Sequence, residues 1–138
     1  MSDMNDFNRG VIEEFRANHG KVGGGFAGAP VVLLTTTGAK SGEKRLNPLV
    51  ALVDGDTLYV FASKGGAPTS PDWYHNLVAN PEVEVEFADD RFTATAVPLT
   101  AGPERDRLYA AQVAAQPGFG DYEKATTRVI PVVELRRS

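Results

Sequence analysis

Six short runs of strand-forming residues, most of them separated by tight turns, dominate this 138-residue sequence. The run over 82–88 alternates apolar residues with glutamates, which is typical of a strand with one buried face. Asp54-Gly55-Asp56 is a strong hairpin signal, and Asp89-Asp90 marks another turn. A short antiparallel sheet must hide its edges, which favours closure into a small barrel. The expected strands span 31–37, 46–53, 57–62, 82–88, 92–99 and 129–135.

Helical patterns flank these strands. Ser70 is a suitable N-cap and Pro71 a suitable first residue for a short helix over 71–79. A second helix is expected over 104–116, and Tyr122 falls in a further short helix or turn. Pro48 cannot donate to a strand ladder and indicates an edge position or a bulge.

The N-terminal segment predicts a helix over 5–18, whose role is either to pack over the sheet or to act as a lid or membrane contact. Its apolar residues recur at helical spacing and are Phe7, Val11, Ile12 and Phe15. We expect one domain over 1–138, in which this helix and a glycine-rich connector form a separate N-terminal element over 1–25 that could move. Gly23, Gly25 and Gly28 match G-x-G-x-x-G, but a helix precedes them and a strand follows, the reverse of a dinucleotide site.

Composition excludes several classes of function. The chain has no cysteine and two histidines far apart, so we expect neither a disulfide nor a metal site. The formal net charge of -4 argues against general nucleic-acid binding. No apolar run is long enough to span a bilayer, and the N-terminus lacks a signal pattern. The expected compartment is the cytoplasm, with peripheral contact at the inner face of the membrane left open.

The stretch from Ala62 to Leu77 combines a hydroxyl, a cation, bare backbone amides, a helix N-terminus and two aromatic rings. Such a set suits a ligand that is anionic at one end and flat at the other. If the first three strands form a meander, the 38–44 turn and the end of the third strand meet beside this helix. That arrangement predicts a basic rim of Lys40, Ser41, Lys44, Arg45, Ser63 and Lys64. The alternative is that these are ordinary exposed turn residues, and that Trp73 and Tyr74 belong to the core.

The sequence carries no known catalytic motif of its own. G-x-S-x-G and the P-loop pattern are both missing, and His75 is better explained as a structural residue than as a base. Any enzyme here would therefore take its chemistry from a cofactor.

Four blocks carry a resemblance to a known family: TTTGAKSGEKR, NPL, ASKGGAPTSPDWYHNLVANPEVEVE and TRVIPVVEL. In these blocks the chain resembles the deazaflavin-dependent nitroreductases, in order and along nearly its whole length. The resemblance implies an α+β fold, a split β-barrel of about six mainly antiparallel strands with flanking helices. It also implies coenzyme F420, which has a flat tricyclic ring, a phosphate and an oligoglutamate tail.

The resemblance assigns roles to residues of this chain. It places the phosphate and tail at Lys40, Ser41 and Arg45, with Ser63, Lys64, Gly65 and Gly66 nearby. The remaining cofactor contacts that it implies are Asn47, Pro48 and Leu49 at the ring edge, and Trp73, Tyr74 and Asn76 completing the pocket. Tyr122 would position the substrate or donate a proton.

The acceptors that the resemblance implies are quinones, nitroaromatics and other electron-poor unsaturated compounds. This chain has Val50 and Phe119 where some nitroreductases of the family carry tyrosines, which favours a quinone. Two alternatives remain: a flavin mononucleotide (FMN) enzyme of the wider split-barrel group, and a non-catalytic deazaflavin carrier. The sequence leaves open whether the chain is a monomer or a homodimer.

Overall fold

The computed structural model describes residues 3–23, 29–64 and 69–137 of the chain, with side chains from residue 9 onward. The elements are α1 (Asp3–Ala17), β1 (Val31–Thr37), β2 (Lys44–Asp54), β3 (Thr57–Phe61), α2 (Asp72–Ala79), β4 (Glu82–Phe87), β5 (Asp90–Leu99), α3 (Pro103–Ala115), α4 (Gly118–Ala125) and β6 (Val132–Arg137). The six strands form a closed antiparallel barrel in the order β1-β2-β3-β6-β5-β4. The predicted barrel is thereby confirmed, and its strands match the expected ranges to within three residues at each end.

The barrel closes through the pairing of β1 with β4, in which Leu34 lies opposite Val85. The long strand β2 changes partner along its length, because it pairs with β1 up to Val50 and with β3 from Ala51 onward. The first part of β2 therefore has a strand neighbour on one side only. Pro48 lies in that part, opposite Leu33, which agrees with the predicted edge position.

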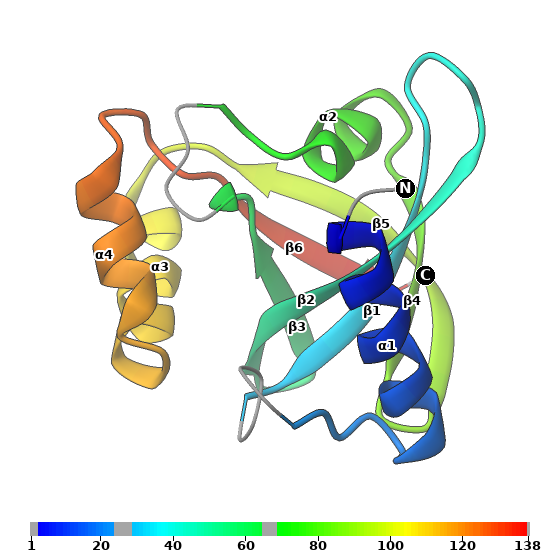
Figure 1. Ribbon diagram of the computed structural model, residues 1–138. Coiled ribbons are helices and arrows are strands. Elements are labelled where there is room, and N and C mark those ends of the chain that lie inside the picture. The colour runs from blue at the N-terminus through cyan, green and yellow to red at the C-terminus, as the bar shows by residue number, and fades with distance from the viewer. Residues whose placement is uncertain (1–2, 24–28, 65–68, 138) are drawn as a thin grey trace.

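Side-chain alternation explains how the helices are arranged. Along β1, Val32 and Leu34 point into the barrel, whereas Val31 and Leu33 pack against Phe15 of α1. Both faces of β1 are therefore buried, and the packing role predicted for the N-terminal helix is confirmed at Phe15. Figure 1 shows α1 lying along β1 and β2, with α3 and α4 together on another side of the barrel.

The short helix α2 covers one end of the barrel (Figure 1). Its Trp73 and Leu77 belong to the same buried cluster as the inward-facing strand residues. A second cluster lies between the outer face of β3 and β6 and the helices α3 and α4. Within the ranges described, no helix is long and apolar enough to cross a membrane.

The start of α2 corrects one prediction. The N-cap position is Pro71, not Ser70, and it makes no side-chain capping bond. The hydroxyl of Ser70 instead accepts a hydrogen bond from Arg128 Nη1 at 3.1 Å. The Ser70 hydroxyl, which the local sequence predicted as the helix cap, is thus bound by an arginine 58 residues away.

Candidate functional site

The loop between β1 and β2 is fixed to α2 by two asparagines. Asn76 Oδ1 accepts a hydrogen bond from the backbone N–H of Ala39 at 3.0 Å, and Asn76 Nδ2 donates to Thr36 Oγ1 at 3.4 Å. Asn80 Nδ2 donates to the carbonyl of Thr37 at 3.4 Å. Asn76, which was predicted as a pocket residue, thus positions the loop that carries the basic residues.

The loop itself is a tight turn. The N–H of Gly38 donates to the carbonyl of Glu43 at 2.7 Å, and Ser41 Oγ accepts from the N–H of Glu43 at 3.1 Å. A Cβ on Gly38 would lie 2.6 Å from Ser41 Oγ and 3.2 Å from the carbonyl of Glu43, so a larger residue here would displace the Ser41 hydroxyl from this turn. Because these bonds fix the turn, Lys40 is held on an exposed loop of defined shape.

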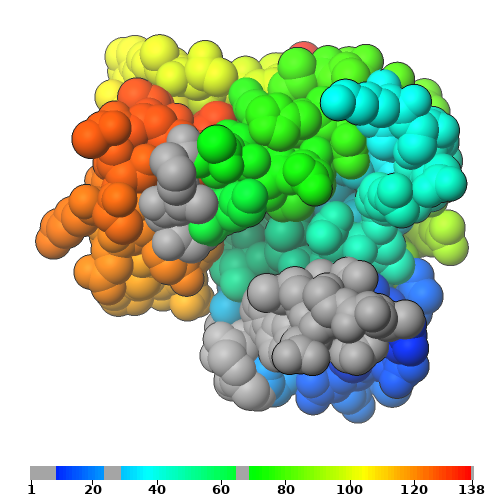
Figure 2. Space-filling model, turned by 45° about the horizontal axis from the view of Figure 1, so that its top comes forward, coloured from blue at the N-terminus to red at the C-terminus, as the bar shows by residue number. Residues whose placement is uncertain are grey.

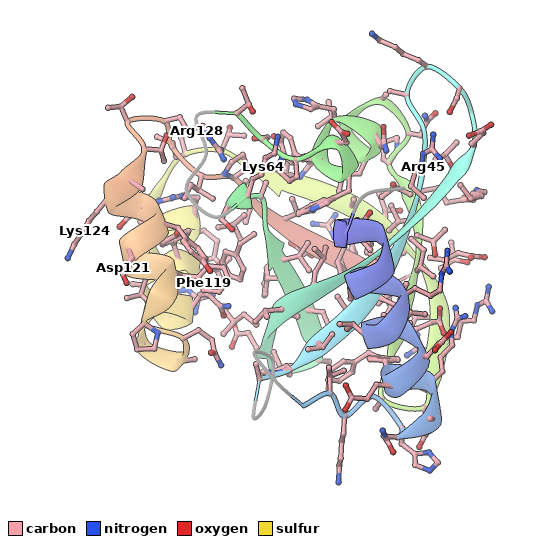
Figure 3. The ribbon with its side chains drawn as sticks, in the orientation of Figure 1. Arg45, Lys64, Phe119, Asp121, Lys124 and Arg128 are labelled. Atoms are coloured by element: carbon pink, nitrogen blue, oxygen red, sulfur yellow. The ribbon has the colours of Figure 1, made fainter. Side chains whose placement is uncertain are left out.

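The basic rim predicted from the sequence lies at the α2 end of the barrel. Because β1, β2 and β3 form the predicted antiparallel meander, the 38–43 loop and the end of β3 share that end. Figure 3 shows Arg45 and Lys64 on the two sides of α2. Lys44 Nζ donates to Thr37 Oγ1 at 2.9 Å, and Arg45 Nη2 lies 3.2 Å from Glu43 Oε2. Both are exposed contacts, and exposed contacts of this kind contribute little to stability.

The end of β3 carries the other candidate residues. Ser63 is buried, whereas Lys64 is exposed and has a positive φ of 49°. Gly65 and Gly66 lie outside the described residues. In the space-filling view, the surface of β2 and β3 is set back beside α2 and the 38–43 loop (Figure 2).

The two aromatic residues of α2 have different environments. Trp73 is only 6% exposed and packs in the barrel core, as the alternative interpretation expected. Tyr74 is half-buried, with its ring centroid 6.5 Å from that of Trp73. Burial raises the pKa of the Tyr74 hydroxyl. Tyr74 is therefore the accessible aromatic group of this helix.

The expected ring-edge residues lie on the part of β2 that pairs with β1 alone. Asn47 is opposite Leu34, and Leu49 is opposite Val32. Pro48 is buried, whereas Asn47 and Leu49 are half-buried. Leu49 packs against the barrel core.

A cluster of aromatic rings lies between β3 and α4. The ring centroids of Phe119 and Tyr122 are 5.2 Å apart, and those of Phe61 and Phe119 are 5.6 Å apart. The hydroxyl of Tyr109 donates to the carbonyl of Phe119 at 2.7 Å, which fixes the start of α4. Burial raises the pKa of Tyr109 to about 12. Phe61 ends β3, so this aromatic wall (Phe61, Tyr109, Phe119 and Tyr122) adjoins the segment that carries Lys64.

Sequence reasoning missed two arginines, Arg105 and Arg128. Arg105 is buried, and its Nε and Nη2 donate to the carbonyl of Ile130 at 3.1 and 2.9 Å. Arg128 Nη2 donates to the carbonyls of Ala62 and Ser63 at 3.0 and 3.1 Å. Both bind backbone groups far away in sequence, which no local spacing reveals. The one signal was that Arg128 lies inside the block TRVIPVVEL.

The residues at this end suit a ligand that is anionic and flat. The cations come from β2, from its preceding loop and from the end of β3. The accessible apolar surface comes from Phe119 and Tyr122 of α4, because Phe61 behind them is buried. Among the described residues, no cluster of three or more His, Asp or Glu side chains could bind a metal ion. The chain itself thus offers groups that can bind and position a ligand, and the tyrosine hydroxyls, such as that of Tyr122, are groups that can donate a proton.

Comparison with known proteins gives consistent matches. Residues 7–136 match the family model described as F420H(2)-dependent quinone reductase. An F420H(2)-dependent quinone reductase of Mycobacterium tuberculosis is 42% identical over 128 residues, which cover 89% of this chain and 85% of that protein.

Two solved structures have a similar fold. One, an F420-H2 dependent reductase, has a TM-score of 0.71 and 42% identity, covering 78% of this chain and 94% of that chain. The other, a domain-swapped dimer, has a TM-score of 0.73 and 36% identity, covering 97% and 100%.

Proposed function

This chain belongs to the F420H(2)-dependent quinone reductase family, and we propose that it reduces quinones with F420H2 held between the basic rim and the aromatic wall. The observation that carries the proposal is the position of Lys64. Lys64 directly follows Phe61-Ala62-Ser63, so one short segment connects Phe61 of the aromatic wall to the cationic surface beside α2. A cofactor whose anionic tail lies on this cationic surface has the aromatic wall beside it, where a flat acceptor can bind.

The donor set fits the cofactor. The phosphate and glutamate carboxylates require cations and N–H donors, and the rim offers Lys40, Lys44, Arg45 and Lys64, all exposed. Exposed cations at the rim of an acidic chain also attract an anionic ligand during its approach. We assign the ring to the surface of Asn47, Leu49 and Tyr74, where half-buried groups adjoin the barrel core.

When bound, F420H2 supplies a hydride to the acceptor. The task of this chain is to hold the acceptor against the ring and to supply a proton to the reduced quinone. We assign acceptor contact to Phe119 and Tyr122, with the Tyr122 hydroxyl as proton donor.

A quinone is the preferred acceptor in this proposal, ahead of a nitroaromatic. Val50 and Phe119 carry no hydroxyl, and Phe119 packs edge-on against Phe61 and Tyr122. A surface of this kind favours a flat apolar ring and offers few hydrogen bonds to a nitro group. Turnover of a nitroaromatic at a rate comparable with that of menadione would contradict this preference.

Two measurements test the proposed function. The purified chain is titrated with F420 and separately with FMN, following cofactor fluorescence and the fluorescence of Trp73. We expect tight binding of F420 alone, followed by steady oxidation of F420H2 when menadione is added. Preference for FMN would support the flavin alternative. Binding of F420 without turnover of any quinone would leave the carrier as the better description.

A further inference from the structure

Arg128 joins two parts of the chain that flank the candidate cofactor surface. Its Nη2 donates to the carbonyls of Ala62, Ser63 and Thr69 at 3.0, 3.1 and 3.1 Å. Its Nη1 donates to Ser70 Oγ at 3.1 Å. One half-buried guanidinium thus binds both the residues before Lys64 and the residues that lead into α2.

Arginine is chemically suited to this position. Its planar guanidinium presents five N–H donors in a fixed fork, so it can reach several carbonyl groups at once. A lysine offers three donors from a single atom and cannot reproduce this geometry. The contacts depend therefore on the shape of the side chain as well as on its charge.

The contacts also bear on the conformation of Lys64. This residue has a φ of 49°, in the left-handed region that side chains with a Cβ rarely adopt. Such a conformation persists where the surrounding structure fixes the backbone. The two carbonyls bound by Arg128 belong to Ala62 and Ser63, directly before Lys64.

Arg128 further connects this segment to α4, which ends three residues earlier at Ala125. Its own N–H donates to Thr126 Oγ1 at 3.3 Å, so the short link from α4 has a defined turn. Figure 3 shows Arg128 above α4, on the side that faces Lys64.

We propose that Arg128 is a positioning residue for cofactor binding, which holds Lys64 where its ammonium group meets the phosphate or tail of F420. This inference rests on the proposed function. Arg128 acts through Lys64, so its removal should weaken binding of the anionic part of the cofactor and spare binding of the ring.

The test compares two ligands in the full chain. The variant Arg128→Lys is titrated with F420 and with the deazaflavin ring lacking phosphate and tail. We expect the dissociation constant for F420 to rise about tenfold, or about 1.4 kcal/mol, and that for the tail-free ring to change less than twofold. Arg136→Lys is the matched control, because Arg136 is exposed and pairs with Glu134 at 3.0 Å. It should leave both constants unchanged.

A double-mutant cycle tests the action through Lys64. Lys64→Ala alone should also weaken F420 binding about tenfold, and adding Arg128→Lys to it should cost little more. Additive losses would overturn the proposal, as would equal losses for both ligands together with a lower melting temperature. Unchanged F420 binding by Arg128→Lys would overturn it as well.

If Arg128→Lys does not fold, Ser70→Ala replaces it, because this change removes only one of the four acceptors named above and leaves the arginine in place. An unchanged ratio of the two dissociation constants in Ser70→Ala would then count against the proposal. Failure of the unmodified chain to bind F420 would overturn the proposed function itself. The two failures are therefore distinguishable.

Discussion

Replacing Gln112 by methionine should stabilise the fold. Gln112 lies on the buried face of α3, one turn after Leu108 and Tyr109, and has no exposed surface (0%). Neither its Oε1 nor its Nε2 has a hydrogen-bond partner among the described residues. A buried polar group without a partner costs about 1–3 kcal/mol, and methionine has a similar length without that cost.

The magnitude follows from these values. We expect Gln112→Met to raise the free energy of unfolding by about 1–3 kcal/mol. For a chain of this length the entropy of unfolding is about 0.3 kcal/mol per degree, so the melting temperature should rise by about 3–10 °C. Urea titration should show a higher midpoint with an unchanged m-value.

Gln116→Met provides the control, because Gln116 is the half-buried glutamine one turn later, just after α3. Its effect should stay within about 0.5 kcal/mol. If Gln112→Met instead lowers stability by more than about 1 kcal/mol, the amide is hydrogen-bonded in solution and the reasoning fails.

Three further predictions concern the site and its support. Lys40→Ala or Arg45→Ala should weaken F420 binding about tenfold to a hundredfold through loss of a charged hydrogen bond, with the melting temperature nearly unchanged; unaltered affinity in both would remove them from the site. Tyr122→Phe should lower kcat for menadione about a hundredfold while F420 binding persists, and an unchanged kcat would exclude a proton-donor role. Burial raises the pKa of Tyr109 to about 12, above its ordinary value of about 10, so its contribution to stability is complete below pH 10 and is lost as the pH rises toward 12. Tyr109→Phe should abolish that part of the alkaline decline in pH-dependent unfolding, and should cost about 1 kcal/mol at neutral pH through loss of the bond to Phe119.

The sequence was sufficient for the barrel and for the end of the sheet at which the predicted basic residues lie, although Arg45 and Lys64 are on the two sides of α2 and do not converge. Strand alternation and the Asp54-Gly55-Asp56 turn are local signals, and the meander of β1, β2 and β3 follows from them. Given that meander, the 38–43 loop and Lys64 must share one end of the sheet.

The sequence was insufficient where the contact of a side chain is with a residue far away in the sequence. Ser70 was predicted to cap α2, but Arg128 binds its hydroxyl. Arg105 binds the carbonyl of Ile130, which precedes β6, through a contact that follows from packing of α3 on the barrel. Trp73 was open to two interpretations because core and ligand-facing aromatics share one sequence pattern, and only burial separates them.

The strand order of the barrel also constrains when this chain can fold. Strand β6 is the last to be synthesised, yet it lies between β3 and β5 and pairs with both. Until β6 emerges from the ribosome, β3 and β5 each expose a strand edge able to pair with another chain. Arg128 and the aromatic residues of α4 are translated shortly before β6. The barrel can therefore close only after β6 has been translated, and before then the nascent chain passes through an interval in which these open edges favour aggregation.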